Sequence, residues 1–308
     1  MASIKELTKA PERFTRGHRA CLGCGCALAV RQVLLASSDY PVVCSVATGC
    51  LEIFSTIYPY TSWDVPLIHS AFENAPTTIA GAEAAYKALK RKGKIDRDIK
   101  FISFSGDGGT YDIGLQFLSG CIERRHSCLY VCYDNQAYMN TGIQRSSATP
   151  LGSNTTTSPA GTKFPGKLQP RKDLTEIVIA HEPSYAAQTS PAYWNDLVTK
   201  VRKALSKEGP TFINILGACP LGWRYPPEKT IEVTRLATET CFWPLYEYED
   251  GKYKINRIPK EKRPLEEWLK LQGRFRHLFT PENRHIIEEL QKEVDRKWER
   301  LKKRAEEG

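Results

Sequence analysis

Apolar and polar positions along this chain follow two different periods, which predicts a sheet with helices packed on it. Runs rich in β-branched and aromatic residues have the pattern of buried strands at 41–47, 100–105, 128–133 and 211–216. Between them, apolar residues recur at helical spacing over 25–37, 71–92, 112–125 and 194–207. This alternation predicts an α/β fold, a mainly parallel sheet with helices on both faces.

Two segments depart from this alternation. Residues 141–172 are dominated by Ser, Thr, Gly, Pro and Asn, so we expect a long loop over an active site or subunit interface. From residue 221 the chain has the pattern of an extended C-terminal arm with prolines, ending in a charged helix over 281–307. Its apolar stripe is narrow, which favours packing on a neighbouring subunit. We therefore divide the chain into a cofactor-binding domain, 1–220, and a subunit-contacting segment, 221–308.

Composition and charge exclude several classes of protein. Of the 308 residues, 41 % are hydrophobic, as in ordinary globular proteins. The apolar stretches are shorter than the roughly 20 residues of a membrane span, and the first residues lack the apolar core of a signal peptide. We expect a cytoplasmic protein that makes no membrane contact.

The net charge of +9 is concentrated near the C-terminus. Residues 251–308 hold 17 Lys and Arg against 11 Asp and Glu, so this segment carries +6. It is a mixed-charge tail without a recognisable nucleic-acid module, so we expect no nucleic-acid binding. The tail is solvated or contacts other subunits, and acidic protein partners are an alternative.

Ten cysteines in a chain without an export signal favour metal or redox chemistry over disulfides. Four lie in apolar segments, where free cysteine acts as a small hydrophobe: Cys44, Cys121, Cys128 and Cys132. Cys26 and Cys241 are ambiguous by the same criterion.

A glycine-rich segment follows the predicted strand 100–105 and precedes a helix. It consists of Gly106, Asp107, Gly108 and Gly109. Glycines let backbone amides approach phosphate, the helix N-terminus is positive, and Asp107 can hold a divalent cation. In isolation, a turn with an N-capping aspartate explains the same residues.

A second polar segment strengthens the phosphate interpretation. Asn135 lies 28 residues after Asp107, at the end of the next predicted strand. One strand–helix–strand unit would bring both residues to the same edge of the sheet. Asp107, the Asn135 side-chain oxygen and a carbonyl near Ala137 would then bind Mg²⁺ together with two diphosphate oxygens. This spacing resembles the thiamine diphosphate fingerprint.

The amino-acid sequence of this region resembles one family more closely than it resembles the general thiamine diphosphate fingerprint. The runs GDGGTYDIGLQFLSG and YDNQAYMNTGIQRS are similar to the β subunit of pyruvate (2-oxoacid):ferredoxin oxidoreductases. Further matching pieces are GHRACLGCG (17–25), ATGCLE (47–52), FENAP (72–76), CPLGW (219–223) and LKLQGRFRHL (269–278). The resemblance covers most of 17–278 and implies a thiamine-diphosphate-binding fold.

The resemblance also implies a [4Fe-4S] cluster and its ligands. The matching positions are Cys21, Cys24, Cys50 and Cys219. From the residues alone, Cys21 and Cys24 form a ligand pair, but Cys50 and Cys219 could not be selected, and a Cys₄ zinc site fits equally. The thiamine fingerprint favours iron, because a redox relay beside a reactive carbon has a use that zinc lacks.

Further residues are assigned by the same resemblance. Asn140 and Thr141 would lie near the diphosphate or the reactive carbon. Thr48, Glu52 and Asn74 are expected in the pocket, although capping or solvated roles fit them equally. Cys26 stands where some relatives have an acid; we expect a packing residue, with contact to the thiamine or the cluster as the alternative.

The implied reaction is a reversible oxidative decarboxylation of a 2-oxoacid, pyruvate first, to acyl-coenzyme A and carbon dioxide. Electrons would pass singly to the cluster and then to ferredoxin. No carboxyl here has the signature for activating thiamine, and no bacterial ferredoxin-type cysteine run is present, so α, γ and δ subunits or fused equivalents are expected.

Several functions remain as alternatives. The chain could act on 2-oxoisovalerate, 2-oxoglutarate or oxalate. It could also belong to a non-redox thiamine decarboxylase or carboligase, or bind the cofactor as a scaffold subunit without turnover.

Overall fold

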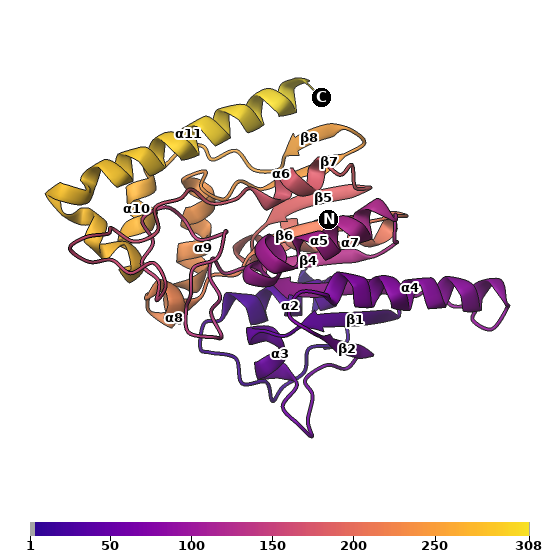
Figure 1. Ribbon diagram of the computed structural model, residues 1–308. Coiled ribbons are helices and arrows are strands. Elements are labelled where there is room, and N and C mark those ends of the chain that lie inside the picture. The colour runs from indigo at the N-terminus through magenta and orange to yellow at the C-terminus, as the bar shows by residue number, and fades with distance from the viewer. Residues whose placement is uncertain (1–3, 308) are drawn as a thin grey trace.

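The computed structural model describes residues 4–307 and contains one eight-stranded sheet with helices on both sides (Figure 1). The strand order is β2-β1-β3-β4-β6-β5-β7-β8. The first six strands are parallel, β7 pairs antiparallel with β5, and β8 pairs antiparallel with β7. The strands are β1 (Val42–Ala47), β2 (Leu67–Ser70), β3 (Lys100–Gly106), β4 (Leu129–Asp134), β5 (Tyr185–Thr189), β6 (Thr211–Leu216), β7 (Tyr246–Glu249) and β8 (Lys252–Ile255). The predicted fold class is confirmed.

The helices lie between and after these strands. The α-helices are α1 (Ile4–Leu7), α2 (Gly25–Ala36), α3 (Cys50–Ser55), α4 (Ala75–Arg91), α5 (Leu115–Glu123), α6 (Leu174–Ile179), α7 (Trp194–Ser206), α8 (Pro220–Trp223), α9 (Thr230–Glu239), α10 (Leu265–Lys270) and α11 (Arg284–Glu307). A π-type turn, η1 (Gly108–Ile113), precedes α5, and short 3₁₀ turns are η2 (Pro191–Tyr193), η3 (Pro227–Lys229), η4 (Gly273–Phe279) and η5 (Pro281–Asn283). Within the described part of the chain, none of these helices is long and apolar enough to cross a membrane.

Both faces of the sheet are buried, which explains the continuous apolar strands. In β4, Leu129 and Val131 pack in one cluster with α2 and α7, whereas Tyr130 and Cys132 pack in another with α5 and α6. Successive side chains of a strand point to opposite faces, so every residue of β4 is buried. Such doubly covered strands are typical of parallel sheets.

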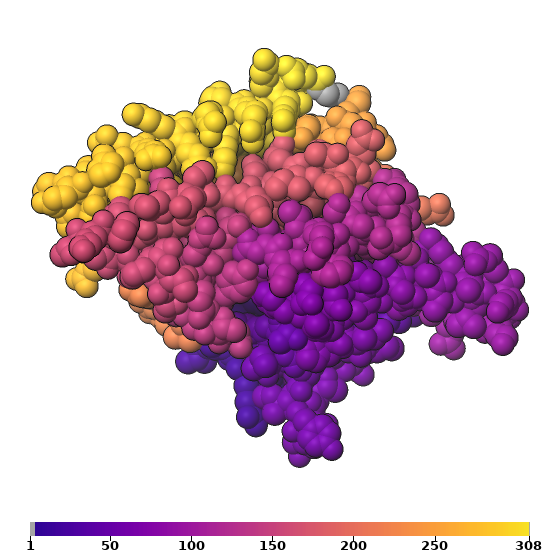
Figure 2. Space-filling model, in the orientation of Figure 1, coloured from indigo at the N-terminus to yellow at the C-terminus, as the bar shows by residue number. Residues whose placement is uncertain are grey.

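The segment after residue 220 is more structured than its sequence predicted. It contains α8 to α11 and the β7–β8 pair. The stripe of α11, which includes Ile286, Leu290 and Trp298, is buried in the same hydrophobic cluster as Trp223 of this chain. The prediction that this stripe lies on a neighbouring subunit is therefore wrong, because the chain covers it with its own residues. Figure 2 shows α11, in yellow, lying along one side of the molecule.

The long loop was predicted correctly, since 141–172 contains no helix or named strand. Residue 146 and residues 148–153 of the loop are buried, and Ala148 and Leu151 share a hydrophobic cluster with Ile286 of α11. The loop is thus held between the sheet and the C-terminal helix. The division at residue 220 and the subunit contacts of 221–308 stay predictions.

Candidate cofactor and metal site

The candidate residues follow the carboxyl ends of four neighbouring strands. Cys50 follows β1, Asp107 follows β3, Asn135 follows β4 and Cys219 follows β6, and these strands are adjacent in the sheet. The chain places β2 on one side of β1 and β3 on the other. The edge outside such a reversal of strand order is where open α/β sheets bind ligands.

An open cleft lies at this edge. Its volume is about 690 Å³ including its open mouth, within the size range of cofactor pockets. The lining residues are Thr48, Gly49, Cys50, Phe72, Gly106, Gly108, Tyr133, Asn135, Ala137, Tyr138, Met139, Asn140 and Thr141.

The Asp107 carboxylate is buried behind this cleft and is held by donors. Oδ1 accepts the backbone N–H groups of Asn135 and Gln136, each at 3.1 Å. Oδ2 accepts the Ser146 hydroxyl at 2.5 Å. Three donors from two segments therefore fix the orientation of this carboxylate before any ligand arrives.

Three oxygens converge beside it; we call Asp107 Oδ1, the Asn135 side-chain oxygen and the Ala137 carbonyl oxygen the oxygen cradle. The Asn135 oxygen lies 2.7 Å from Asp107 Oδ1 and 2.8 Å from Ala137 O, and it faces acceptors only. Rotation of the amide by 180° would turn these contacts into hydrogen bonds. A cation among the three oxygens would satisfy the observed orientation, and this donor set suits Mg²⁺.

The electrostatics of the oxygen cradle also favour a cation. Burial raises the pKa of Asp107 well above its ordinary value, and the charge of nearby Asp134 raises it further. Burial also raises the pKa of Asp134, although the Arg171 guanidinium opposes this shift and donates to Asp134 at 2.7 Å. Arg171 thus pairs with Asp134, and a divalent cation beside Asp107 would compensate this second buried carboxyl.

Cys21, Cys24, Cys50 and Cys219, here called the cysteine set, lie beside the cleft. Cys24 is the N-cap of α2, Cys50 is the first residue of α3, and Cys219 is the N-cap of α8. The Cys24 N–H donates to Cys21 O at 3.1 Å across the turn between them. A positive helix N-terminus stabilises a thiolate, and the twelve-residue helix α2 provides one at Cys24.

Backbone contacts bring the Cys21–Cys24 turn against the segment that contains Cys219. The Gly25 N–H donates to Ala218 O at 3.0 Å, and the Thr230 hydroxyl donates to Gly23 O at 2.6 Å. A Cβ atom on Gly25 would lie 2.7 Å from both the N and O atoms of Ala218. Glycine is therefore required for this close approach.

The thiols of the cysteine set influence one another. Burial, together with the charges of Cys219 and Cys24, raises the pKa of Cys50 to about 12. Burial also raises the pKa of Cys219 to about 11, whereas a hydrogen bond with Cys26 lowers the pKa of Cys24 to about 7. The four thiols therefore share one neighbourhood.

The cysteine set is not arranged around a single ion. Within residues 4–307, no group of three or more His, Cys, Asp or Glu side chains is placed as ligands of one metal ion. An iron–sulfur cluster is bound at its corners, with each thiolate on a different iron atom. The arrangement is thus a neighbourhood of thiols, and the ligand set stays a prediction.

Cys50 connects the two groups of residues. It belongs to the cysteine set and also lines the cleft. A hydrogen bond with the Asn140 side chain lowers the pKa of Cys50, opposing the effect of burial. Thr48 and Thr141 also line the cleft.

Other predicted site residues lie farther from the cleft surface. Glu52 turns toward Thr56 and His69, and Gly109 is not among the lining residues. Asn74 is the N-cap of α4, and its buried side-chain oxygen has no hydrogen-bond partner among the described residues. Cys26 is buried beside Cys24, which fits the expected packing role.

Several residues of the candidate site were not predicted from the sequence. Phe72, Tyr133, Tyr138 and Met139 line the cleft and lie inside the quoted motif runs, so a closer reading of those runs would have included them. Ser146 is the last residue of the quoted run YDNQAYMNTGIQRS, but its hydrogen bond to Asp107 depends on the path of the long loop, which no sequence pattern predicts.

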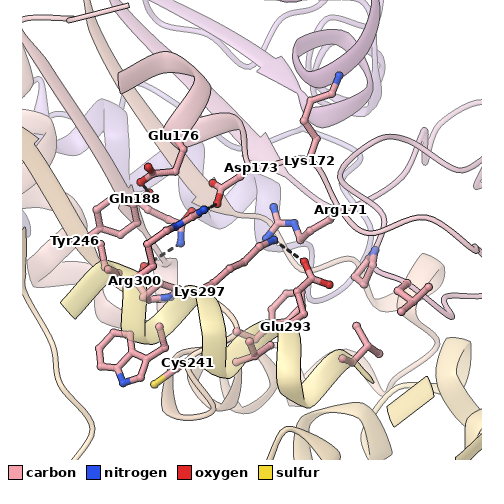
Figure 3. A pocket seen from close by; sticks show the side chains of 18 of the residues that line it. Arg171, Lys172, Asp173, Glu176, Gln188, Cys241, Tyr246, Glu293, Lys297 and Arg300 are labelled. Carbon is pink, nitrogen blue, oxygen red and sulfur yellow. Dashed lines mark hydrogen bonds and ion pairs between the residues drawn. The ribbon is translucent and has the colours of Figure 1, made fainter. Parts of the chain in front are cut away.

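Figure 3 shows a second pocket, beneath α11. Its charged groups include the ion pair Glu293–Lys297 at 2.6 Å. Arg171 lines this pocket and reaches Asp134 at 2.7 Å. The pocket is part of the packing of α11, and Arg171 joins it to the candidate site.

Comparisons with known proteins agree with the predicted family of thiamine diphosphate enzymes. The family described as "Thiamine pyrophosphate enzyme, C-terminal TPP binding domain" matches residues 47–215. Pyruvate synthase subunit PorB of Thermotoga maritima is 53 % identical over 302 residues, covering 96 % of this chain and 93 % of the relative. Ketoisovalerate oxidoreductase subunit VorB of Pyrococcus furiosus is 48 % identical over 308 residues, covering 99 % and 97 %.

A solved structure shares the fold. It is the 2-oxoglutarate:ferredoxin oxidoreductase from Magnetococcus marinus, with a TM-score of 0.56 and 19 % identity over 71 % of this chain and 77 % of that one.

Proposed function

Since this chain belongs to the β subunits of pyruvate and related 2-oxoacid:ferredoxin oxidoreductases, which are thiamine diphosphate enzymes built from several subunits, we propose the roles of its residues as follows. The cleft holds thiamine diphosphate, the oxygen cradle holds Mg²⁺ and the cysteine set holds a [4Fe-4S] cluster. The complex converts a 2-oxoacid and coenzyme A to acyl-coenzyme A and carbon dioxide, reversibly, and passes electrons to ferredoxin.

One observation carries this proposal: Cys50 is both a member of the cysteine set and a wall of the cleft. A non-redox thiamine enzyme would need the cleft and the oxygen cradle but has no use for neighbouring thiols there. When bound, the cofactor would supply the carbon nucleophile for the keto group, and the cluster would take up single electrons.

The residues of this chain bind and orient these groups. Asp107, Asn135 and Ala137 hold the cation, and the segment Gly106–Gly109 faces the diphosphate with its amides and the start of η1. Asn140 and Thr141, which line the cleft together with Cys50, would lie near the reacting carbon. Thr48 and Asn74 complete the cofactor-binding residues.

We expect the remaining parts to come from other chains in the cytoplasm. The carboxyl that activates the thiamine ring would belong to an α subunit, and γ and δ subunits or fused equivalents would carry electrons to ferredoxin. Residues 221–308 would contribute subunit contacts. This chain alone should therefore be inactive.

Pyruvate is the proposed substrate. Relatives named pyruvate synthase reach 54 % identity, whereas those named ketoisovalerate oxidoreductase reach 50 %. The difference is small, so a branched-chain 2-oxoacid is the second candidate, to be tested by comparing kcat/KM for pyruvate and 2-oxoisovalerate.

The decisive experiment is anaerobic co-expression with the partner chains, followed by iron and thiamine analysis and electron paramagnetic resonance of the reduced complex. We expect one thiamine diphosphate per copy of this chain, and four iron atoms per copy in addition to those bound by the electron-carrying partner subunits. Zinc, or no metal, in an anaerobic preparation would contradict the cluster, and iron without thiamine would contradict the cleft assignment.

A further inference from the structure

Arg274 is a buried cation with neutral partners. It is 2 % exposed, and its guanidinium donates to the side-chain oxygens of Gln272 at 2.7 Å and Gln136 at 2.6 Å. The indole ring of Trp223 lies against it, with the ring centroid 4.0 Å from Cζ. None of the ion pairs found in residues 4–307 includes Arg274. Burying an unpaired charge costs several kcal/mol, so this position calls for a compensating anion.

Arg274 lies between the oxygen cradle and the cysteine set. Trp223 ends the four-residue helix α8, whose N-cap is Cys219, and the Trp223 indole N–H donates to Asn135 O at 2.7 Å. On the other side, the Gln136 N–H donates to Asp107 Oδ1 at 3.1 Å. The two side chains that contact the guanidinium, Trp223 and Gln136, thus belong to the segments that contain Cys219 and the oxygen cradle.

The charged groups that interact with Arg274 belong mainly to these two sites. Burial, the largest effect, lowers the pKa of Arg274, and the charges of Cys219, Tyr225, Asp134 and Asp107 raise it. Cys219 is the first of these opposing groups. The guanidinium is therefore close enough to interact with whatever charge Cys219 and its ligand carry.

We propose that Arg274 is a positioning residue for electron transfer: its fixed positive charge stabilises the reduced form of the cluster held by Cys219. This inference rests on the proposed function. When one electron leaves the bound substrate and enters the cluster, the cluster becomes more negative by one charge. A nearby buried cation stabilises the reduced form more than the oxidised form, and Arg274 itself gains and loses nothing.

The two glutamine partners are essential to this role. A carboxylate in place of Gln136 or Gln272 would neutralise the guanidinium and cancel its effect on the cluster. Amides instead fix its orientation without adding charge, and the Asn154 N–H anchors the Arg274 backbone carbonyl at 3.0 Å.

Four variants of the co-expressed complex test the proposal. Arg274→Met removes the charge and retains an unbranched side chain, and Arg274→Lys retains the charge. Gln136→Glu introduces a carboxylate where the 2.6 Å contact now lies. Arg224→Met is the matched control, since Arg224 is exposed and follows α8 directly. Iron content, the thermal unfolding midpoint and the cluster midpoint potential are measured, the last by a dithionite titration that does not require thiamine diphosphate.

We expect Arg274→Met and Gln136→Glu to keep their iron and to shift the midpoint potential to more negative values. An about tenfold loss in the equilibrium constant for one-electron uptake corresponds to about 59 mV. Arg274→Lys and Arg224→Met should retain the wild-type potential.

Two results would overturn the proposal. The first is a wild-type potential in both Arg274→Met and Gln136→Glu with full iron. The second is loss of iron in both of them while Arg274→Lys keeps it, which would make Arg274 an assembly residue. If only Arg274→Met fails to fold, the potential of Gln136→Glu decides. Absence of iron from the wild-type complex would instead contradict the proposed function.

Discussion

The oxygen cradle and the cysteine set lie side by side at one sheet edge, yet the chain prepares them differently. Asp107 is completely buried, and Asn135 and Ala137 are 6 % and 4 % exposed. Cys21 is exposed, and the other three cysteines are half-buried. Three hydrogen bonds orient Asp107, whereas backbone packing of the turns positions the cysteines.

This difference separates two ways of building a metal site. The oxygen cradle is preorganised, so a cation would add charge compensation to an arrangement that already exists. The cysteine set provides sulfur atoms in one neighbourhood and would leave their final placement to the proposed cluster. The cradle should therefore depend on individual side chains, and the cysteine set on both its thiols and the backbone contacts that bring them together.

The largest effect is expected for Asp107→Ala. It removes the central ligand of the oxygen cradle and should weaken Mg²⁺-dependent thiamine diphosphate binding by at least about 100-fold, since even outer-shell changes cost 10- to 100-fold. Iron content should be unchanged. Isothermal titration calorimetry measures the thiamine diphosphate affinity, and iron analysis measures the iron content. Asp98→Ala, at a side chain that is 60 % exposed, is the control. Unchanged affinity would remove Asp107 from the site.

Cys219→Ser should have the next largest effect. The variant should lose or alter its cluster, because serine replaces a thiolate ligand, and it should still bind thiamine diphosphate. Iron analysis and electron paramagnetic resonance give the readout. Cys241→Ser, at a buried cysteine beneath α11, is the control and should retain its iron. Wild-type iron content and spectra in Cys219→Ser would reject this ligand set.

Gly25→Ala probes the backbone contacts of the cysteine set. The new methyl group would lie 2.7 Å from Ala218 and should lower the free energy of unfolding by about 1–3 kcal/mol, with partial loss of iron. Denaturant unfolding measures the change in the free energy of unfolding, and iron analysis measures the loss of iron. Gly81→Ala is the matched control, since no atom lies within 4 Å of the new Cβ and alanine favours a helix. Equal stability and iron in the two variants would mean that the contact is dispensable.

The smallest effect is expected for Ser146→Ala. Loss of the hydroxyl that donates to Asp107 Oδ2 should cost about 1.5 kcal/mol, or roughly tenfold in thiamine diphosphate affinity. Calorimetry of this variant is compared with Ser158→Ala in the same loop. If both variants bind like the wild type, the orientation of Asp107 does not depend on this donor.

The sequence was most informative where burial is complete. The strands β1, β3, β4 and β6 were predicted to within one or two residues, because helices on both faces require continuous apolar runs. The edge strand β2 has only four residues, and β5 contains Ala186 and Ala187, which lack the β-branched signal. Both were therefore missed.

Prediction of the candidate site was limited in the same way, because local sequence patterns revealed only part of it. The proximity of Asp107 and Asn135 followed from one strand–helix–strand spacing. Ser146, Trp223 and Arg274 come from a loop and a C-terminal segment whose paths no local pattern defines. Cys50 and Cys219 were selected by resemblance, because their proximity depends on how β1 and β6 are ordered in the sheet.

The position of α11 has a consequence for the order of biosynthesis. The helix packs on the loop that carries Ser146, and Gly152 of that loop lies against Ile286 and Leu278. These partners lie more than 120 residues after Gly152 in the sequence. The loop can therefore take its final position only after the segment that contains Leu278 and Ile286 has been synthesised and has folded onto it.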